Sequence, residues 1–216
     1  MFGKLFGKKE KVVDKPRIAG LEVNTSFSLD KLSISLMMDK LTIREIAQDH
    51  RILGAGVVDL DDTKLLRFYT DDEAWLQVAH TGENLPENII DVNLFHYYDT
   101  LSIAGEAQWE ETLRQVGRET YELDGKVFTR AWDGVSTDGS GSIEAVAMTE
   151  TAYDETDEPG VTDQFVMLFE RDIGDDRQEL LFVSAEEKAV DDGERFERCL
   201  VLSTGIKLTS AQIDIN

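Results

Sequence analysis

Short apolar runs, rich in β-branched and aromatic residues, recur along the chain after residue 50 and are separated by polar positions. Their length and their period of about two residues are typical of β-strands. The predicted strands cover residues 52–60, 63–70, 74–79, 89–98, 126–133, 143–151, 164–171, 178–184 and 195–202. The pattern therefore predicts a β-rich α+β fold, with antiparallel sheets of about ten short strands and one clear helix.

That helix is expected over residues 106–116. Trp109, Leu113 and Val116 recur at helical spacing and give it one narrow apolar face. Gly117 follows directly, where a glycine in the left-handed conformation commonly ends a helix.

Two kinds of connecting segment stand out. Residues 21–50 are ambiguous, because residues 32–36 alternate like a strand while their leucines also fit a helical stripe. The links 61–62, 71–73 and 172–176 are acidic, and short carboxylate side chains favour turns by bonding to their own backbone.

Charge divides the chain into two parts. The 216 residues carry a net charge of -22, but residues 1–17 hold six basic and two acidic side chains, a net charge of +4. The remaining residues therefore carry -26. We expect a basic, flexible N-terminal segment (1–17) followed by a single acidic globular domain (18–216) or two small lobes.

The N-terminal segment also carries apolar anchors. Phe2, Leu5 and Phe6 fall on one face of a helix, although Gly3 and Gly7 disfavour that helix in water. A basic segment with such anchors is suited to an anionic lipid surface, and a solubilising leader is the alternative. The membrane-contact candidates are Phe2, Lys4, Leu5, Phe6, Lys8, Lys9 and Lys11.

Composition excludes several classes of protein. Beyond residue 17 no basic stripe is present to neutralise phosphates, so nucleic-acid binding is disfavoured. No apolar stretch approaches the ~20 residues that span a bilayer, and no signal peptide is recognisable. Cys199 is the only cysteine, so no intrachain disulfide can form, and its apolar surroundings predict a small buried hydrophobe. We expect a cytoplasmic protein, peripheral to the inner membrane if the N-terminus binds lipid.

The motifs of phosphate loops, zinc proteases, redox dithiols and serine hydrolases are absent. The acidic clusters lack the spacing of a calcium loop, since the third position of the cluster that starts at Asp154 is Thr156. No metal site and no cofactor is expected, and an enzymatic activity is not favoured.

Weak pocket candidates remain. His96 and Tyr98 lie in the stretch richest in reactive groups, and they share one face if that stretch is a strand. His96 could pair with a distant carboxylate. Arg130, next but one to Trp132, could stack on the indole or bind a carboxylate. The alternative is that His96 and Tyr98 belong to a packed strand end and that Arg130 has a structural role.

Several stretches in combination resemble a known family: residues 66–78, the helix with Trp109, residues 128–132, and residues 167–171 followed by 179–181, together with the Met-Phe-Gly-Lys-Leu-Phe-Gly-Lys-Lys start. The chain is similar over nearly its whole length to the YjfK-like family of uncharacterised bacterial proteins. The resemblance implies no catalytic residue. It implies a genetic neighbourhood with a PspA-like coiled-coil protein, small membrane proteins and an ATP-grasp ligase similar to glutathionylspermidine synthase.

Two functions are therefore expected. The first is a non-enzymatic adaptor that binds a protein partner, PspA-like or envelope-associated, while its basic N-terminus contacts the inner membrane. The alternative is an accessory subunit or enzyme that handles cationic amine substrates, linked to ATP-grasp ligase chemistry, because an acidic body attracts amines.

Overall fold

The computed structural model describes residues 15–43, 45–132, 141–154, 158–190 and 195–215. These residues form twelve strands, two α-helices and two 3₁₀ helices. The strands are β1 (Ser26–Leu29), β2 (Asp49–Leu60), β3 (Thr63–Thr70), β4 (Ala74–Thr81), β5 (Ile89–Ser102), β6 (Thr120–Leu123), β7 (Lys126–Arg130), β8 (Val146–Tyr153), β9 (Gly160–Gly174), β10 (Arg177–Val190), β11 (Arg195–Lys207) and β12 (Ile213–Ile215). The helices are α1 (Lys31–Ser35), η1 (Met38–Lys40), η2 (Pro86–Asn88) and α2 (Glu106–Val116).

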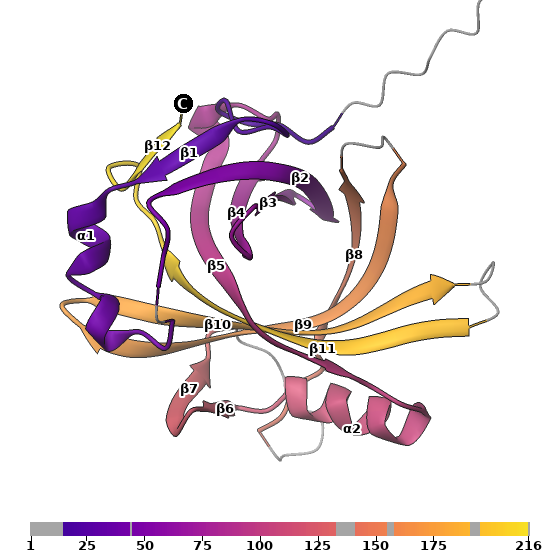
Figure 1. Ribbon diagram of the computed structural model, residues 1–216. Helices are drawn as coiled ribbons and strands as arrows, with labels where there is room; N and C mark the ends of the chain where they lie inside the picture. The colour runs from indigo at the N-terminus through magenta and orange to yellow at the C-terminus, as the bar shows by residue number, and fades with distance from the viewer. Residues whose placement is uncertain (1–14, 44, 133–140, 155–157, 191–194, 216) are drawn as a thin grey trace, which may run out of the picture.

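Eight of the strands close into a ring. The antiparallel order is β2-β3-β4-β5-β11-β10-β9, and β8 pairs with both β9 and β2, which completes the circle. We call these eight strands the closed sheet. Figure 1 looks into the ring, with β8 on the right and β9 to β11 below. β1 and β12 extend the sheet from β2, and β7 and β6 extend it from β9.

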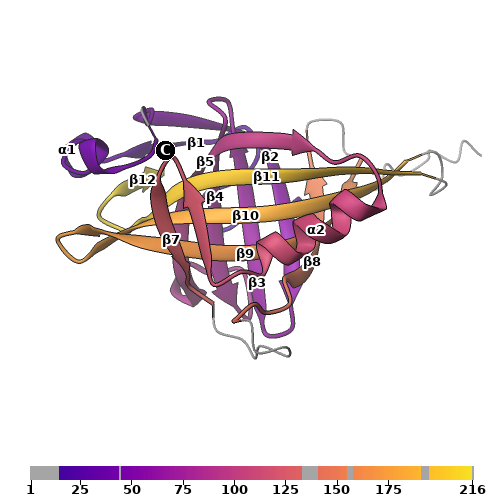
Figure 2. The same cartoon turned by 90° about the horizontal axis from the view of Figure 1, so that it is seen from below.

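Alternation along each strand separates an interior from two outer cores, because successive side chains point to opposite faces. On β3, Leu66 and Phe68 pack outward beneath β1, α1 and β12. The second outer core, around Phe128 and Met167, lies beneath α2, β6 and β7. Figure 2 shows α2 and the β6–β7 hairpin against the face formed by β9, β10 and β11. The interior holds an aromatic cluster that includes Trp75.

The helix predicted at 106–116 is present with those bounds, and Trp109 and Val116 are buried. The expected left-handed stop is wrong, because Gly117 has φ -80°. Glycine is needed there for a different reason. A Cβ on Gly117 would lie 2.0 Å from the carbonyl oxygen of Ile143, whose amide donates to the Gly117 carbonyl at 2.9 Å.

The β-rich prediction is confirmed, but the strands are longer and more numerous than expected. β2, β5, β9, β10 and β11 each run for 12 to 15 residues. β10 was predicted to end at Ser184, yet it continues to Val190 paired with β11. Glu186, Glu187 and Lys188 are not apolar, so the hydrophobic pattern missed this part of β10. Backbone hydrogen bonds to β11 form it.

The ambiguous segment and the acidic turns are also resolved. Residues 31–35 form α1, and Asp30 caps the helix by accepting from the Ser33 amide at 2.7 Å. The β9–β10 turn is made by Asp175 and Asp176, which adopt φ 59° and 55°. Short acidic side chains tolerate this left-handed conformation better than most residues do.

Candidate functional site

An acidic pocket opens on the outer face of β5, between the loop that follows η1, the β3–β4 turn and the β6–β7 turn. Its volume is about 540 Å³. Five carboxylate side chains line it: Glu45, Asp72, Glu73, Asp99 and Asp124. No lysine or arginine is among the described residues that line this acidic pocket. Such a lining attracts cations and repels anions.

Asp72 is held at this site by buried partners. His50, which is 1% exposed, donates from Nδ1 to Asp72 Oδ1 at 3.0 Å, and the Thr70 hydroxyl lies 2.5 Å from the same oxygen. Burial alone would raise the pKa of Asp72, but these hydrogen bonds and the two nearby histidines hold it below its ordinary value. Asp72 is therefore an ionised acceptor in a fixed position.

His96 forms the buried part of the pocket wall. Its ring centroid lies 6.3 Å from that of His50, in an edge-on arrangement. Desolvation lowers the pKa of His96 to about 4; the charge of Asp72 opposes that shift and His50 adds to it. The ring is consequently neutral at neutral pH, so it can accept or donate one hydrogen bond without carrying charge.

Two groups that line the acidic pocket lack hydrogen-bond partners. His96 is 9% exposed and its Nε2 is buried without a partner. Thr204 Oγ1 is in the same situation, with the residue fully buried. Buried polar atoms are paired in the great majority of cases, so orphaned atoms beside a cavity point to a bound group or water that completes them.

The loop wall of the pocket is fixed by a buried carboxylate. Glu179 on β10 is fully buried, accepts from the Thr42 amide at 2.5 Å and pairs with Arg171. Lys126 donates to the Thr42 hydroxyl at 3.1 Å. The Lys126 ammonium thus lies behind the lining and offsets part of the negative charge of the pocket.

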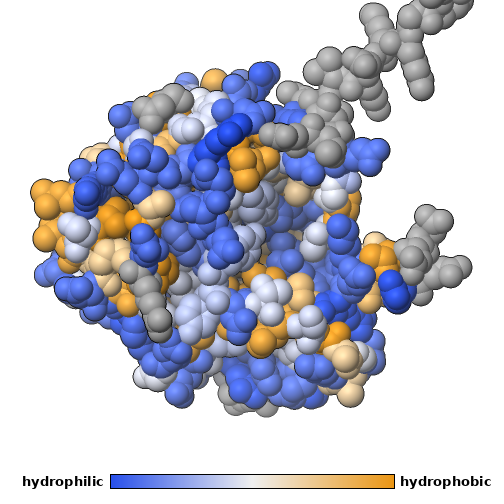
Figure 3. Space-filling model, in the orientation of Figure 1, coloured by the Kyte–Doolittle hydropathy of each residue, from blue (hydrophilic) through white to orange (hydrophobic). Residues whose placement is uncertain are grey.

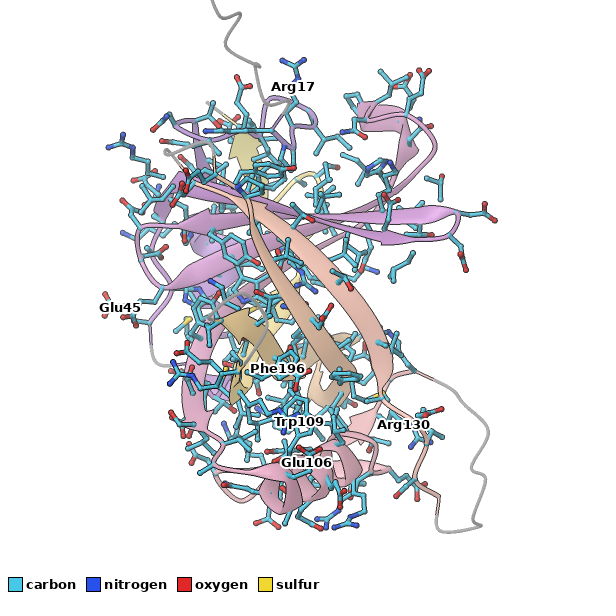
Figure 4. The ribbon with its side chains drawn as sticks, turned by 90° about the vertical axis from the view of Figure 1, so that its right-hand side faces the viewer. Arg17, Glu45, Glu106, Trp109, Arg130 and Phe196 are labelled. Carbon is cyan, nitrogen blue, oxygen red and sulfur yellow. The ribbon has the colours of Figure 1, made fainter. Side chains whose placement is uncertain are left out.

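The structure separates the four pocket candidates into two pairs. His96 and Tyr98 both line the acidic pocket. Arg130 and Trp132 do not line it: Arg130 lies beside α2 (Figure 4), and Trp132 packs against the core clusters that include Trp109 and Phe95. Within the part of the chain that the structure describes, Arg130 contacts neither an indole face nor a carboxylate. It donates to the main-chain carbonyls of Trp132, Gly117 and Gly141 at 3.0 to 3.2 Å.

Two residues of this site were missed from sequence. His50 was not among the residues selected, because it lies far from His96 along the chain, and Asp72 was predicted only as part of an acidic turn. The β3–β4 turn was the available signal, because its acidic residues lie at the end of a hairpin next to the strand that carries His50. The membrane-contact candidates, Phe2 to Lys11, lie outside the described residues.

A second polar cluster fills the interior of the closed sheet. Arg67 donates to Glu150 at 2.9 Å and to Gln164 at 2.7 Å, and Tyr69 donates to Glu150 at 2.5 Å. Burial raises the pKa of Tyr69, and Glu150 adds to the shift. These groups satisfy one another, so the cluster is a structural core.

A third cluster joins α2 to the closed sheet. Arg198 on β11 donates to Glu106 at 2.6 Å and to Glu187 at 2.5 Å, and its guanidinium lies 4.9 Å from the centroid of the Trp109 ring. Figure 4 shows Glu106, Trp109 and Phe196 together near α2, away from Glu45 of the acidic pocket. The charged groups of this third cluster pair with one another, and their contacts hold α2 against the closed sheet.

The comparisons with known proteins agree with the resemblance seen in the sequence. A family model described as "Protein of unknown function (DUF2491)" matches residues 1–214. The chain belongs to the DUF2491 family. It is 30% identical over 222 residues to the uncharacterised protein YjfK of Escherichia coli (strain K12), an alignment that covers 98% of this chain and 97% of YjfK. No solved structure matches this DUF2491 chain.

Two absences hold for the described residues, one for metal binding and one for membrane crossing. No group of three or more His, Cys, Asp or Glu side chains in that part of the chain is arranged to hold a metal ion. None of its helices is long and apolar enough to cross a membrane.

Proposed function

We propose that this DUF2491 protein is a binding module for cationic amines, and that the acidic pocket beside His96 takes the ammonium group. One observation carries the proposal: five carboxylates surround a pocket whose buried wall holds unpartnered polar atoms on His96 and Thr204. Unpaired acceptors and negative charge in one cavity call for a ligand that is both a donor and a cation.

An alkylammonium group meets both needs. It offers three hydrogen-bond donors and one positive charge, and it leaves an aliphatic stem to pack elsewhere. Asp72, ionised and fixed by His50, is an acceptor held in position for that group. The ring of Tyr98, at the pocket edge, adds a face on which a cation can rest. The net charge of -22 attracts such ligands from a distance.

The chemistry of His96 favours binding over catalysis. A general base works best when its pKa lies near the working pH. With its pKa lowered to about 4, His96 cannot remove a proton from an ammonium group. It can accept a hydrogen bond from that group, which is the role of a recognition residue. An accessory subunit that presents an amine to a partner enzyme would need no more.

Calorimetry tests the proposal. We expect saturable binding of 1,4-diaminobutane and spermidine at low salt, and none of 1,4-butanediol, which has the same length without charge. The variant Glu45→Gln/Asp99→Asn/Asp124→Asn should bind the diamine at least about tenfold more weakly, because three of the five pocket charges are removed.

A matched control separates the pocket from the overall charge. The variant Asp62→Asn/Glu110→Gln/Glu158→Gln removes three exposed carboxylates that do not line the acidic pocket. It should keep the wild-type affinity. Equal weakening in both triple variants, or no saturable heat with wild-type protein, would overturn the proposal.

A second function is supported by the charge reversal near residue 17. We propose that the basic N-terminus attaches the protein reversibly to anionic lipid on the cytoplasmic side of the inner membrane, where a protein partner is bound. Each basic residue near such a surface contributes about 1 kcal/mol. Flotation with anionic vesicles at two salt concentrations tests it, comparing the full chain with a chain that lacks residues 1–14. Flotation that is unaffected by truncation and by salt would contradict this attachment.

A further inference from the structure

An apolar groove lies where residues 19–21 meet β12. Its volume is about 480 Å³, and its lining is dominated by aliphatic side chains from four separate segments. They include Leu21, Val78, Pro86, Ile89 and Ile215. We call this feature the apolar groove. The occurrence of a concave aliphatic surface on so highly charged a chain points to an occupant.

The border of the apolar groove is acidic. Glu22 and Glu87 are exposed, and each is adjacent in sequence to a residue that lines the groove. The lysine in the lining, Lys207, is paired with Asp91. The groove therefore suits an apolar ligand whose flanks carry positive charge.

The chain itself contains a segment of that description. Phe2, Leu5 and Phe6 share one helical face, and Lys4, Lys8 and Lys9 accompany them. An isolated helix here is disfavoured by its glycines, so the face would form against a surface that buries it. We propose that the apolar groove is the docking site of the chain's own first residues, with Phe2, Leu5 and Phe6 inserted and the lysines facing the acidic border.

The connection to the groove is short. The Arg17 carbonyl accepts from Asn84 Nδ2 at 3.1 Å, and Asn84 lies two residues before Pro86 of the groove lining. Arg17 therefore lies near the groove, while Lys15, the first described residue, donates from its ammonium to the Asp154 carbonyl at 2.6 Å. Phe6 lies eleven positions before Arg17, and such a length spans at most ~40 Å when extended. Tethering of this kind gives an effective concentration in the millimolar range, so modest intrinsic affinity is sufficient.

Docking would hide the residues that a membrane contact needs. The three apolar side chains cannot lie in the groove and in lipid at once, so the groove competes with the membrane for one segment. The docking itself requires neither the amine pocket nor lipid binding, and it can be tested without either ligand.

The test uses a labelled synthetic peptide of residues 1–14 and a chain that lacks those residues. Fluorescence anisotropy at low salt should show saturable binding of the peptide to the truncated chain. The peptide with Phe2→Ser, Leu5→Ser and Phe6→Ser should bind at least about tenfold more weakly. The full chain should bind the wild-type peptide at least about tenfold more weakly than the truncated chain, because its own segment already fills the groove.

Variants of the groove locate the site. Ile90 lines the groove and is 60% exposed, so Ile90→Ser should fold normally and weaken peptide binding at least about fivefold. Val127 on β7 is 57% exposed and lies outside the groove, so Val127→Ser is the matched control and should bind as the parent does. Light scattering of the full chain should show a monomer at all concentrations.

Three outcomes would overturn the proposal. The full and truncated chains could bind the peptide equally well. The serine peptide could bind as well as the parent peptide. Finally, the full chain could form a concentration-dependent dimer that truncation abolishes, in which case the groove holds the segment of a second copy.

Discussion

Arg67 Nη1 and Glu150 Oε2 lie 2.9 Å apart inside the closed sheet, although the two residues are 83 positions apart in the chain. Their side chains are 2% and 5% exposed. Taking both charges out of water is expensive, so the pair persists only because neighbouring groups complete its hydrogen bonds. The guanidinium also lies 5.2 Å from the centroid of the Trp75 ring. One ion pair thus joins β3 to β8 across the interior.

Removing one partner of this pair should be costly. Arg67→Met leaves the Glu150 carboxylate buried without its counter-charge, and we expect a loss of about 3–5 kcal/mol in the free energy of unfolding. The double variant Arg67→Met/Glu150→Leu should lose less than Arg67→Met alone, because no charge is then left unpaired. Urea denaturation measures both values. A loss below about 1 kcal/mol for the single variant would contradict the structural role of the pair.

Gly205 on β11 should tolerate no side chain. A Cβ there would lie 2.4 Å from the carbonyl oxygen of Leu94 on the paired strand β5, and the backbone of a closed sheet cannot retreat. We expect Gly205→Ala to cost about 1–3 kcal/mol of stability. Gly160→Ala on β9 is the matched control, since its Cβ would have no neighbour within 4 Å. Thermal unfolding of both variants checks the difference, and equal behaviour would refute it.

His96 makes the stability of the fold sensitive to acid. Its pKa is about 4 in the folded protein against an ordinary value of 6.5, so the unfolded chain binds the proton more tightly. The contribution of neutral His96 is fully present above pH 6.5 and is lost as the pH falls towards 4, up to about 3 kcal/mol.

The variant His96→Gln isolates this effect from the titration of carboxylates. It cannot take up a proton, so its stability should fall less steeply than that of the wild type between pH 6.5 and 4. Urea midpoints measured at closely spaced pH values give the two slopes. Parallel slopes would show that His96 titrates normally in the folded state.

Cys199 should be a poor nucleophile despite its position near the surface. Burial, assisted by the charge of Glu186, raises the pKa of its thiol to about 11. The thiolate fraction at pH 8 is then about 100-fold below that of an ordinary cysteine. We expect reaction with an aromatic disulfide reagent to be slower by about that factor in the native protein than in urea. Equal rates would mean that the thiol is exposed and unperturbed.

The sequence predicted the local elements better than it predicted how the sheet closes into a ring. The helix at 106–116 was placed correctly because Trp109 and Val116 mark a buried face over three turns. β12 was missed because it is three residues long and exists only through pairing with β1, far away in the chain. The closure of the sheet through β8 is also non-local, and a period-2 pattern describes a strand without naming its neighbours.

The sequence predicted some residues of the candidate site and missed others. His96 and Tyr98 were selected for their chemistry, and both line the acidic pocket. Asp72 and His50 could not be assigned to them, since their contact depends on how the β3–β4 turn meets the start of β2. Arg130 was selected on its aromatic neighbours, but its guanidinium turns to backbone carbonyls instead.

The exposed surface shows one further contrast. Leu32 on α1 and Leu36, which caps the C-terminal end of α1, are 69% and 64% exposed. Figure 3 shows a hydrophobic area at the left of the molecule, over α1, beside surfaces that are mostly hydrophilic. The helix turns part of its apolar side outward, and this explains why the pattern of residues 32–36 was ambiguous.

The pairing of β8 with β2, which we call the seam, is the shortest strand pairing of the closed sheet. Its register runs only from Ala55–Tyr153 to Val58–Glu150, whereas β10 and β11 stay paired from Glu179–Ile206 to Val190–Arg195. Local opening proceeds where the fewest backbone hydrogen bonds must break. Amide protons along this seam should therefore exchange with solvent before those of β10, and water should first reach the Arg67–Glu150 pair by this route.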